Sequence, residues 1–378
     1  MSKKIVLVLL LFFILIFAKN SQATENNNSD KIFKAKVINI LEETDKTLDS
    51  GEKIKQQNLK LLGLEGDFKN KEIVFYGIGN IEVIGEKNYS IGDTVLVAAT
   101  FNSLENSYNY YITDYVRSNG LLIILLFFIL SLIIIGRFKG TRSLISLALT
   151  FLIIILFIIP KIMDGFNPVF IVIIGSIFIL AIIIYLTEGF NLKSHIATGS
   201  IFISLLLVII ISYLFIEITK LTGVFSEDVF SLINIGQQSI NFKGMLLAGI
   251  IVGSLGVLDD VVISQISSVE QLIETNPYQT WQEVYKKAYK IGVSHISSMT
   301  NTLFLAYAGA SLPILIFFVS SNSPFSSFEQ IINNEAISTE IVRALSGSIG
   351  IILSVPLSTF LASYILCLKN KKIKSLNN

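Results

Sequence analysis

The sequence of 378 residues is poor in the residues that build disulfides and metal clusters, with one cysteine and two histidines. The single cysteine, Cys367, excludes an intramolecular disulfide and a cysteine-rich metal cluster. Because His195 and His295 are the only histidines, most histidine-rich metal sites are excluded as well. We therefore expect no metal site and no cofactor.

Charge is also scarce, and apolar residues are in excess. Only 15% of the residues are charged, 52% are hydrophobic, and the mean hydropathy is +0.68. These values predict a polytopic helical membrane protein whose main partner is the lipid bilayer. The net charge of +1 gives no reason to expect nucleic acid as a partner.

Residues 1–23 carry the features of a targeting segment. Lys3 and Lys4 precede an apolar run from Ile5 to Ala18, and Ser21-Gln22-Ala23 ends the segment. The run is short for a membrane span of about 20 residues, so a cleaved signal peptide is our first interpretation. An uncleaved anchor is the alternative, and both place the next segment outside the cytoplasm.

Residues 24–118 are polar and contain short runs typical of strands, separated by turn residues. Alternation of apolar and polar side chains in these runs predicts a small extracytoplasmic all-β domain, an OB-like or SH3-like barrel. We expect this domain to be structural or to dock a partner. The predicted strands are Ile32–Leu41, Ile54–Leu62, Lys71–Tyr76, Ile81–Val83, Asp93–Ala98 and Tyr108–Asp114.

Residues 119–368 contain seven long apolar runs, each able to cross a bilayer about 30 Å thick as a helix. They predict a helix bundle of about seven spans. The runs are Gly120–Gly136, Ser143–Ile159, Val169–Leu186, Ile196–Ile216, Phe242–Ile263, Ile291–Val319 and Ile341–Leu368.

Lysine and arginine predict the orientation of the bundle. Basic clusters follow the first span (137–142), join the fifth to the sixth (286–290), and form a basic tail at 369–378. These clusters lie on one side of the membrane, so we expect the C-terminus in the cytoplasm and the protein in the cytoplasmic membrane. Between the fifth and sixth spans, Asn276, Pro277 and Gln279 predict the capped start of a separate amphipathic helix along the membrane surface.

The segment from Ala248 to Gln271 is an apolar helix interrupted by two adjacent carboxylates, Asp259 and Asp260. In helical register Asp260 shares a face with small and polar residues, which predicts a close helix contact and directs Asp260 into it. An ionisable pair inside a span is a functional-site hypothesis by default. The glycines of the predicted packing seam are Gly249, Gly253 and Gly256.

The sixth span supplies polar side chains at a matching depth. We expect one or both aspartates to join a buried polar cluster with residues of this span. The supporting residues are Ser264, Gln265, His295, Ser298, Asn301 and Thr302. The alternative for the serines and threonines is ordinary hydrogen bonding between helices.

Two adjacent carboxylates cannot both carry a charge cheaply in a medium of low dielectric. The spans offer no basic partner, because Arg343 lies at the outer end of the seventh run. Protons or a cation must therefore neutralise the pair, which favours proton or cation coupling over a purely structural pair.

Residues 253–272 and Met299–Gly309 resemble the YibE/F family of bacterial membrane proteins. A weaker resemblance links the double aspartate, the following helix and the serine-rich span to the proton-reading half of resistance-nodulation-division permeases and SecD/SecF proteins. That resemblance implies a proton-carrying role for Asp259 and Asp260.

We therefore expect a proton- or cation-coupled permease or energy-transducing subunit, as a homo-oligomer or paired with a related subunit. The alternative is a non-transporting scaffold or assembly protein whose β domain docks an envelope partner. We do not expect an enzyme. Adjacent aspartates differ from those of aspartyl membrane proteases, which lie on separate helices and share one proton.

Overall fold

The computed structural model describes residues 31–47, 53–79, 88–102, 106–224, 229, 240–320, 325 and 327–377. The chain divides into two compact units, residues 1–135 and residues 136–378. The predicted signal peptide or anchor at 1–23 and the predicted strand Ile81–Val83 lie outside the described residues.

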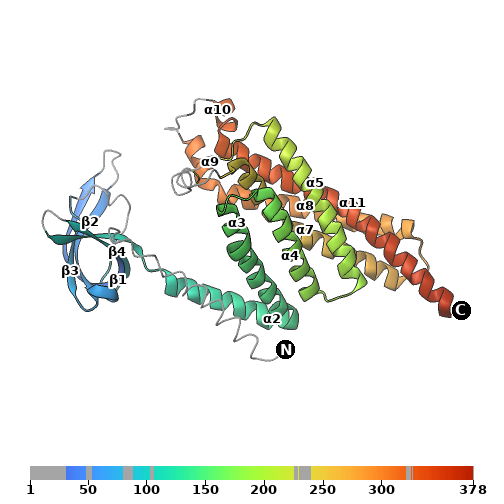
Figure 1. Cartoon of the computed structure of the whole chain (residues 1–378), viewed down its shortest axis with the longest axis horizontal. Helices are drawn as coiled ribbons and strands as arrows, with labels where there is room; N and C mark the ends of the chain where they lie inside the picture. The colour runs from blue at the N-terminus through green and yellow to red at the C-terminus, as the bar shows by residue number, and fades with distance from the viewer. Residues whose placement is uncertain are drawn as a thin grey trace. The chain divides into compact units, whose positions relative to one another are not determined.

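The first unit contains an antiparallel sheet in the order β3-β2-β1-β4-β5 (Figure 1). The five predicted strands that fall within the described residues are confirmed, most of them extended at their ends. The strands are β1 (Lys31–Thr47), β2 (Lys53–Gly63), β3 (Glu72–Tyr76), β4 (Thr94–Asn102) and β5 (Ser107–Tyr115).

Alternation along β1 explains where the core of the sheet lies. Phe33, Ala35 and Val37 are buried, whereas Lys36 between them is exposed. The single-turn helix η1 (Gly66–Phe68) brings Phe68 onto Phe33, with ring centroids 4.3 Å apart. The small all-β domain is thus confirmed, and the OB-like or SH3-like barrel stays a prediction.

The second unit is a helix bundle. The helix α2 (Ser118–Ile153) begins in the first unit and is broken at Arg137, whose φ of 48° and ψ of −128° are not helical. The other helices are η2 (Ile154–Ile158), α3 (Ile159–Met163), α4 (Pro168–Thr187), α5 (Leu192–Ile218), α7 (Phe242–Thr275), α8 (Trp281–Ala310), α9 (Leu312–Val319), α10 (Phe328–Ile332) and α11 (Glu335–Asn377).

Five helical segments of the described chain are long and apolar enough to cross a membrane: Ser118–Met163, Pro168–Thr187, Leu192–Ile218, Phe242–Thr275 and Glu335–Lys371. These segments indicate a multi-pass membrane protein. The first of them contains the first two predicted runs, on either side of the break at Arg137. The sixth predicted run falls on α8 and α9, which are not among the five, so a count of seven spans stays a prediction.

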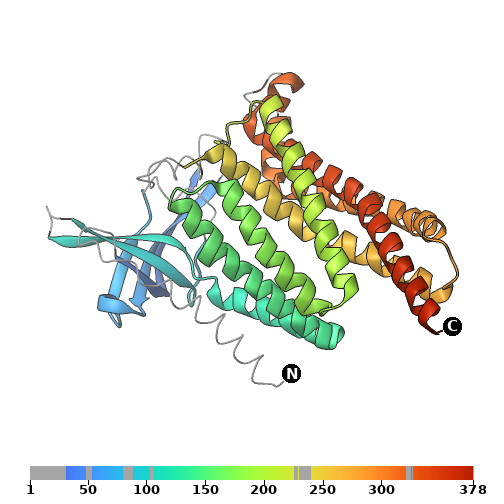
Figure 2. The same ribbon diagram turned by 45° about the vertical axis from the view of Figure 1, so that its right-hand side comes forward.

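Helix α7 is the centre of the bundle. Helices α4, α5, α8 and α11 all contact it, and Figure 2 shows α4, α5 and α7 side by side. Its apolar face is fully buried against these neighbours, as Ile251, Leu258 and Val262 illustrate. The helix that carries the two aspartates is therefore packed among four other helices.

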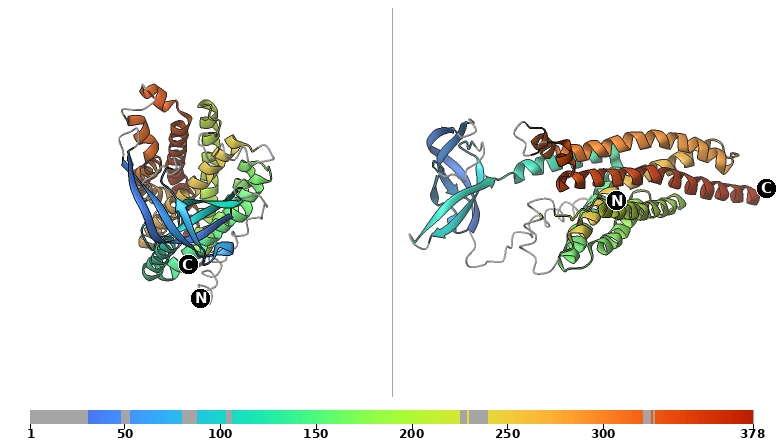
Figure 3. Two further views of the ribbon diagram at one scale, coloured as in Figure 1. Left: turned by 90° about the vertical axis from the view of Figure 1, so that its left-hand side faces the viewer. Right: turned by 90° about the horizontal axis from the view of Figure 1, so that it is seen from above.

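The segment after α7 differs from the prediction. Helix α8 begins at Trp281 and runs unbroken to Ala310, beside α11 (Figure 3). The prediction of a separate surface helix capped at Asn276 is therefore wrong. Thr280 and Glu283 form the capping box, and Asn276 ends α7 instead. The apolar face of the first turns packs on protein, since Trp281 meets Phe360 of α11 edge to face, with centroids 5.8 Å apart.

Within the sheet unit, Gln57 of β2 holds the segment that enters β4. Its Nε2 donates to the carbonyl of Tyr89 at 3.2 Å, and its Oε1 accepts from the Tyr89 N–H at 2.8 Å. Gln57 is 6% exposed and Tyr89 is 4% exposed. Without Gln57, both backbone groups of Tyr89 would lose these partners inside the protein.

We predict that Gln57→Ala destabilises the sheet by about 1–3 kcal/mol, because buried polar groups lose their partners. Hydrogen exchange of β2 and β4 amides in the full-length protein measures this as faster exchange. Lys55→Ala, which removes an exposed ion pair with Glu43 (2.7 Å), is the control and should leave exchange nearly unchanged. Equal effects of the two substitutions would contradict the assignment.

Candidate functional site

Asp259 and Asp260 lie in the middle of α7, and the structure separates their environments. Consecutive residues of a helix point about 100° apart, so two adjacent side chains can have different environments. Asp259 is 8% exposed and lies among the buried residues of α7, whereas Asp260 is exposed. The prediction that Asp260 enters a helix contact is therefore wrong. The face of isoleucine, leucine and valine is buried instead, and Asp259 is buried next to Leu258 of that face.

The carboxylate of Asp259 has one hydrogen-bond donor assigned to it, the backbone N–H of Asp260 at 2.9 Å from Oδ1. In the described part of the chain, no lysine, arginine or histidine forms an ion pair with either aspartate. The same residues contain no group of three or more histidine, cysteine, aspartate or glutamate side chains that could hold a metal ion. Chemically, the arrangement can bind a proton or one small cation.

Gln265 is the member of the predicted polar cluster that contacts the neighbouring helix. It is fully buried, and its Nε2 donates to the carbonyl of Ala288 on α8 at 2.7 Å. Its Oε1 has no partner among the described residues. This contact lies one and a half turns beyond Asp259 and does not include either carboxylate.

The other predicted members do not gather around the aspartates. Ser264 and His295 are half-buried, while Ser298, Asn301 and Thr302 are exposed. The Thr302 hydroxyl donates to the Ser298 carbonyl of its own helix at 3.0 Å.

The phase of α8 explains this arrangement. The helix buries Ala288, Gly292 and Leu303 against the bundle. Asn301 and Thr302 precede Leu303 by two and one residues, and these steps turn them away from that face. The expected buried cluster is thus not formed. The match in depth between the two helices does hold, since Gly253 of α7 lies near Tyr307 of α8. A functional role for these residues stays a prediction.

The predicted glycine seam is exposed. A Cβ built on Gly249 or Gly256 meets no atom within 4 Å, and one on Gly253 meets only the Tyr307 hydroxyl at 3.0 Å. The close approaches lie elsewhere in the bundle. A Cβ on Gly350 of α11 would lie 2.3 Å from Cγ2 of Val208 on α5. The prediction of a packing seam on α7 is wrong for Gly249 and Gly256. As with Asp260, the helix buries its apolar face and leaves the face with the glycines exposed.

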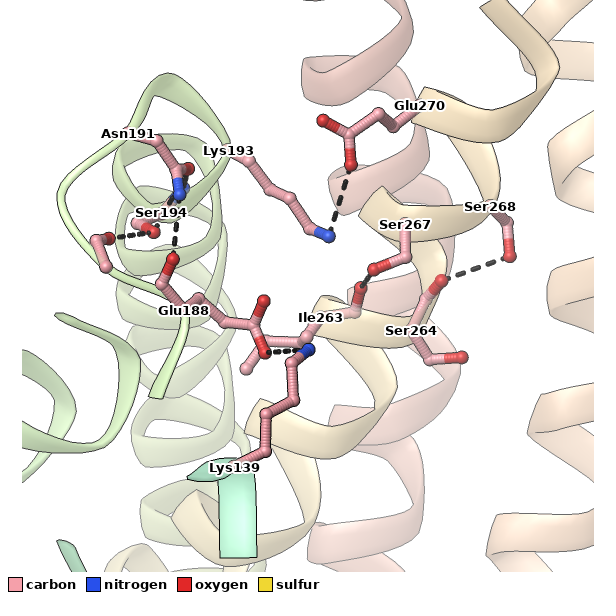
Figure 4. A network of polar contacts seen from close by, with 11 residues as sticks. Lys139, Glu188, Asn191, Lys193, Ser194, Ile263, Ser264, Ser267, Ser268 and Glu270 are labelled. Atoms are coloured by element: carbon pink, nitrogen blue, oxygen red, sulfur yellow. Dashed lines mark hydrogen bonds and ion pairs between the residues drawn. The ribbon is translucent and has the colours of Figure 1, made fainter. Parts of the chain in front are cut away.

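A polar network that the sequence did not reveal ties the turn between α4 and α5 to α7 (Figure 4). Lys193 pairs with Glu270 at 3.2 Å, and Lys139 pairs with Glu188 at 3.7 Å. The residues of each pair are distant in the chain, so no local spacing rule could have joined them. The charged groups of this network lie at the end of the helices, away from the level of Asp259.

One comparison with known proteins identifies a family. A family profile described as YibE/F-like protein matches residues 124–368, more than half of the chain, including both aspartates and the helices α4 to α9. No curated protein and no solved structure matches the chain. The weaker resemblance to resistance-nodulation-division and SecD/SecF proteins stays a prediction.

We predict that Gly350→Ala destabilises the bundle by about 1–3 kcal/mol, because the added methyl group overpacks the contact with Val208. Gly249→Ala is the matched control, and its better helix propensity should stabilise α7 by up to about 1 kcal/mol. Thermal unfolding of the detergent-solubilised protein measures both. If Gly249→Ala proved as unstable as Gly350→Ala, Gly249 would have to lie in a close helix contact, and the packing seam predicted on α7 would be supported after all.

Proposed function

We propose that this chain, which belongs to the YibE/F-like family, is a membrane permease or energy-transducing subunit coupled to protons or another cation through Asp259. Asp260 modulates the same site from the exposed side of α7. The observation that carries the proposal is Asp259, a residue 8% exposed in the middle of the apolar helix α7, without an ion-pair partner among the described residues.

An unpaired carboxylate in a medium of low dielectric is costly in its charged form, so binding of a proton or cation removes a large penalty. The neighbouring carboxylate of Asp260 adds to that penalty when both are charged. Binding therefore changes the relative free energies of alternative helix packings around Asp259. A site of this kind responds to the proton or cation gradient across the membrane.

The position of Asp259 suits coupling. Helix α7 contacts α4, α5, α8 and α11, so a change of charge at Asp259 alters the packing of several helices at once. In this proposal the β domain lies outside the cytoplasm and the C-terminus lies inside. The arrangement follows from the basic residues at 286–290, in the first turns of α8, and from those at 369–374, at the end of α11.

The test is proton uptake by proteoliposomes after a pH jump. We expect the wild-type protein to take up protons and Asp259→Asn to lose the uptake, because an amide cannot exchange a proton in this range. Asp260→Asn should keep part of it. Glu274→Gln, which removes an exposed carboxylate from the end of the same helix, is the control and should match wild type.

Identical uptake by wild type and Asp259→Asn would contradict the proposal. If Asp259→Asn also complements a deletion strain, the scaffold alternative is favoured. One observation supports that alternative: large apolar side chains of the β domain are exposed, among them Ile32 (65%) and Tyr76 (68%). Such side chains suit a docking surface for an envelope partner.

We further propose that two copies, or one copy and a related subunit, assemble through the exposed polar face of α7 and α8. Asp260, Asn301 and Thr302 are exposed on these helices, and polar groups facing lipid are costly. A second copy would cover them with donors and acceptors of the same kind. Native mass spectrometry of nanodisc particles should give the mass of two subunits, and a mass of one subunit would overturn this assignment.

A further inference from the structure

Helices α5 and α11 carry buried serines at intervals of four or eight residues where they pack together. Val208 of α5 lies against α11 at Gly350, and each serine lies four or eight residues, about one or two turns, from one of these two residues on the same face. All six are fully buried. We call them the hydroxyl row: Ser200, Ser204 and Ser212 on α5, and Ser346, Ser354 and Ser358 on α11.

Half of these hydroxyls are without a hydrogen bond. The hydroxyls of Ser204, Ser354 and Ser358 donate to backbone carbonyls of their own helices, at 2.9, 2.8 and 3.3 Å. Those of Ser200, Ser212 and Ser346 have no partner among the described residues. Among the described residues, no hydrogen bond links a serine of α5 to a serine of α11.

Close packing alone does not account for these serines. Alanine would allow the same approach of the two helices without burying an unsatisfied hydroxyl, which costs free energy in an apolar interior. Water or a polar solute between α5 and α11 would supply the partners that these hydroxyls lack.

We propose that α5 and α11 separate along the hydroxyl row to form a water-filled path through the bundle for small, uncharged polar solutes. The proposal rests on the permease function proposed above and assigns it a route. The solute class follows from the lining, because residues 200–212 and 346–358 contain no charged side chain. Hydroxyl groups both donate and accept hydrogen bonds, which suits neutral polar molecules.

The path and the coupling site lie at the same level of the bundle. A Cβ on Gly347 of α11 would lie 3.6 Å from the hydroxyl of Ser254 on α7. Eleven residues further along α7, Gln265 meets Gly292 of α8, which also touches Val355 of α11. Asp259 lies midway between Ser254 and Gln265 along α7, and so at the level of the middle of the hydroxyl row.

Helix α11 also contains a point where it can bend. Pro356 lies inside the helix, between Ser354 and Ser358. Proline has no N–H group, so the carbonyl four residues earlier, that of Ile352, lacks its helical hydrogen bond. Bending of α11 at this point would open the row without unfolding the helix.

Cysteine labelling in proteoliposomes tests the path. In a Cys367→Ser background, which removes the native thiol, Ser200→Cys, Ser212→Cys and Ser346→Cys are treated with a membrane-impermeant thiol reagent on both sides. Ile201→Cys and Ile351→Cys are the matched controls, since both isoleucines are fully buried on the same helices. Gel filtration confirms that each variant is folded.

We expect the three row cysteines to react and the two controls to stay unlabelled. Absence of labelling at all three row cysteines would overturn the proposal. Equal labelling of the controls would also overturn it, because water would then reach buried positions outside the hydroxyl row as well. Asp259→Asn should change the labelling rate of the row cysteines. If the row reacts but Asp259→Asn alters neither labelling nor proton uptake, the path stands and the coupling function fails.

Discussion

The burial of the Asp259 carboxylate in an apolar bundle is the constraint on which the rest of the account depends. A charged group in such a place must be paired, neutralised or hydrated. Pairing is absent within the described chain, since the bundle's ion pairs join other residues. The central helix α7 therefore carries a group whose charge state matters to every helix that packs on it.

The remaining polar groups of the bundle are distributed in a way that isolates this carboxylate. Ion pairs lie toward the ends of the helices, as in Lys193 with Glu270 and Lys243 with Glu217 (2.6 Å). At one such end, Glu335 accepts from the backbone N–H groups of Thr222 (2.6 Å) and Gly223 (2.9 Å). Between the ends, the interior of α5 and α11 offers only neutral hydroxyls. Charge in the middle of the bundle is thus confined to α7.

Local patterns predicted the elements of the fold well. Alternation identified the strands because one face of each is buried, and runs of apolar residues identified the helices because a bilayer demands them. The start of α8 was predicted four residues too early, because Asn276 and Pro277 carry a strong capping signal. The capping box in the structure is formed by Thr280 and Glu283.

Features that depend on helix rotation could not be predicted. Small residues on α7 suggested a packed face, yet the bundle buries the apolar face, and Asp259 replaces Asp260 as the enclosed carboxylate. The serines at 200, 204 and 212 and at 346, 354 and 358 carry a visible period of four. Only the contact of Val208 with Gly350 reveals that the two sets meet.

The most direct test of the central claim is infrared difference spectroscopy of the protein in lipid as the pH is changed. If Asp259 takes up and releases a proton, wild type should show a carboxyl C=O band that varies with pH. That band should persist in Asp260→Asn and disappear in Asp259→Asn. Spectra of wild type and Asp259→Asn that coincide at every pH would contradict the account and leave the buried carboxylate as a structural element of α7.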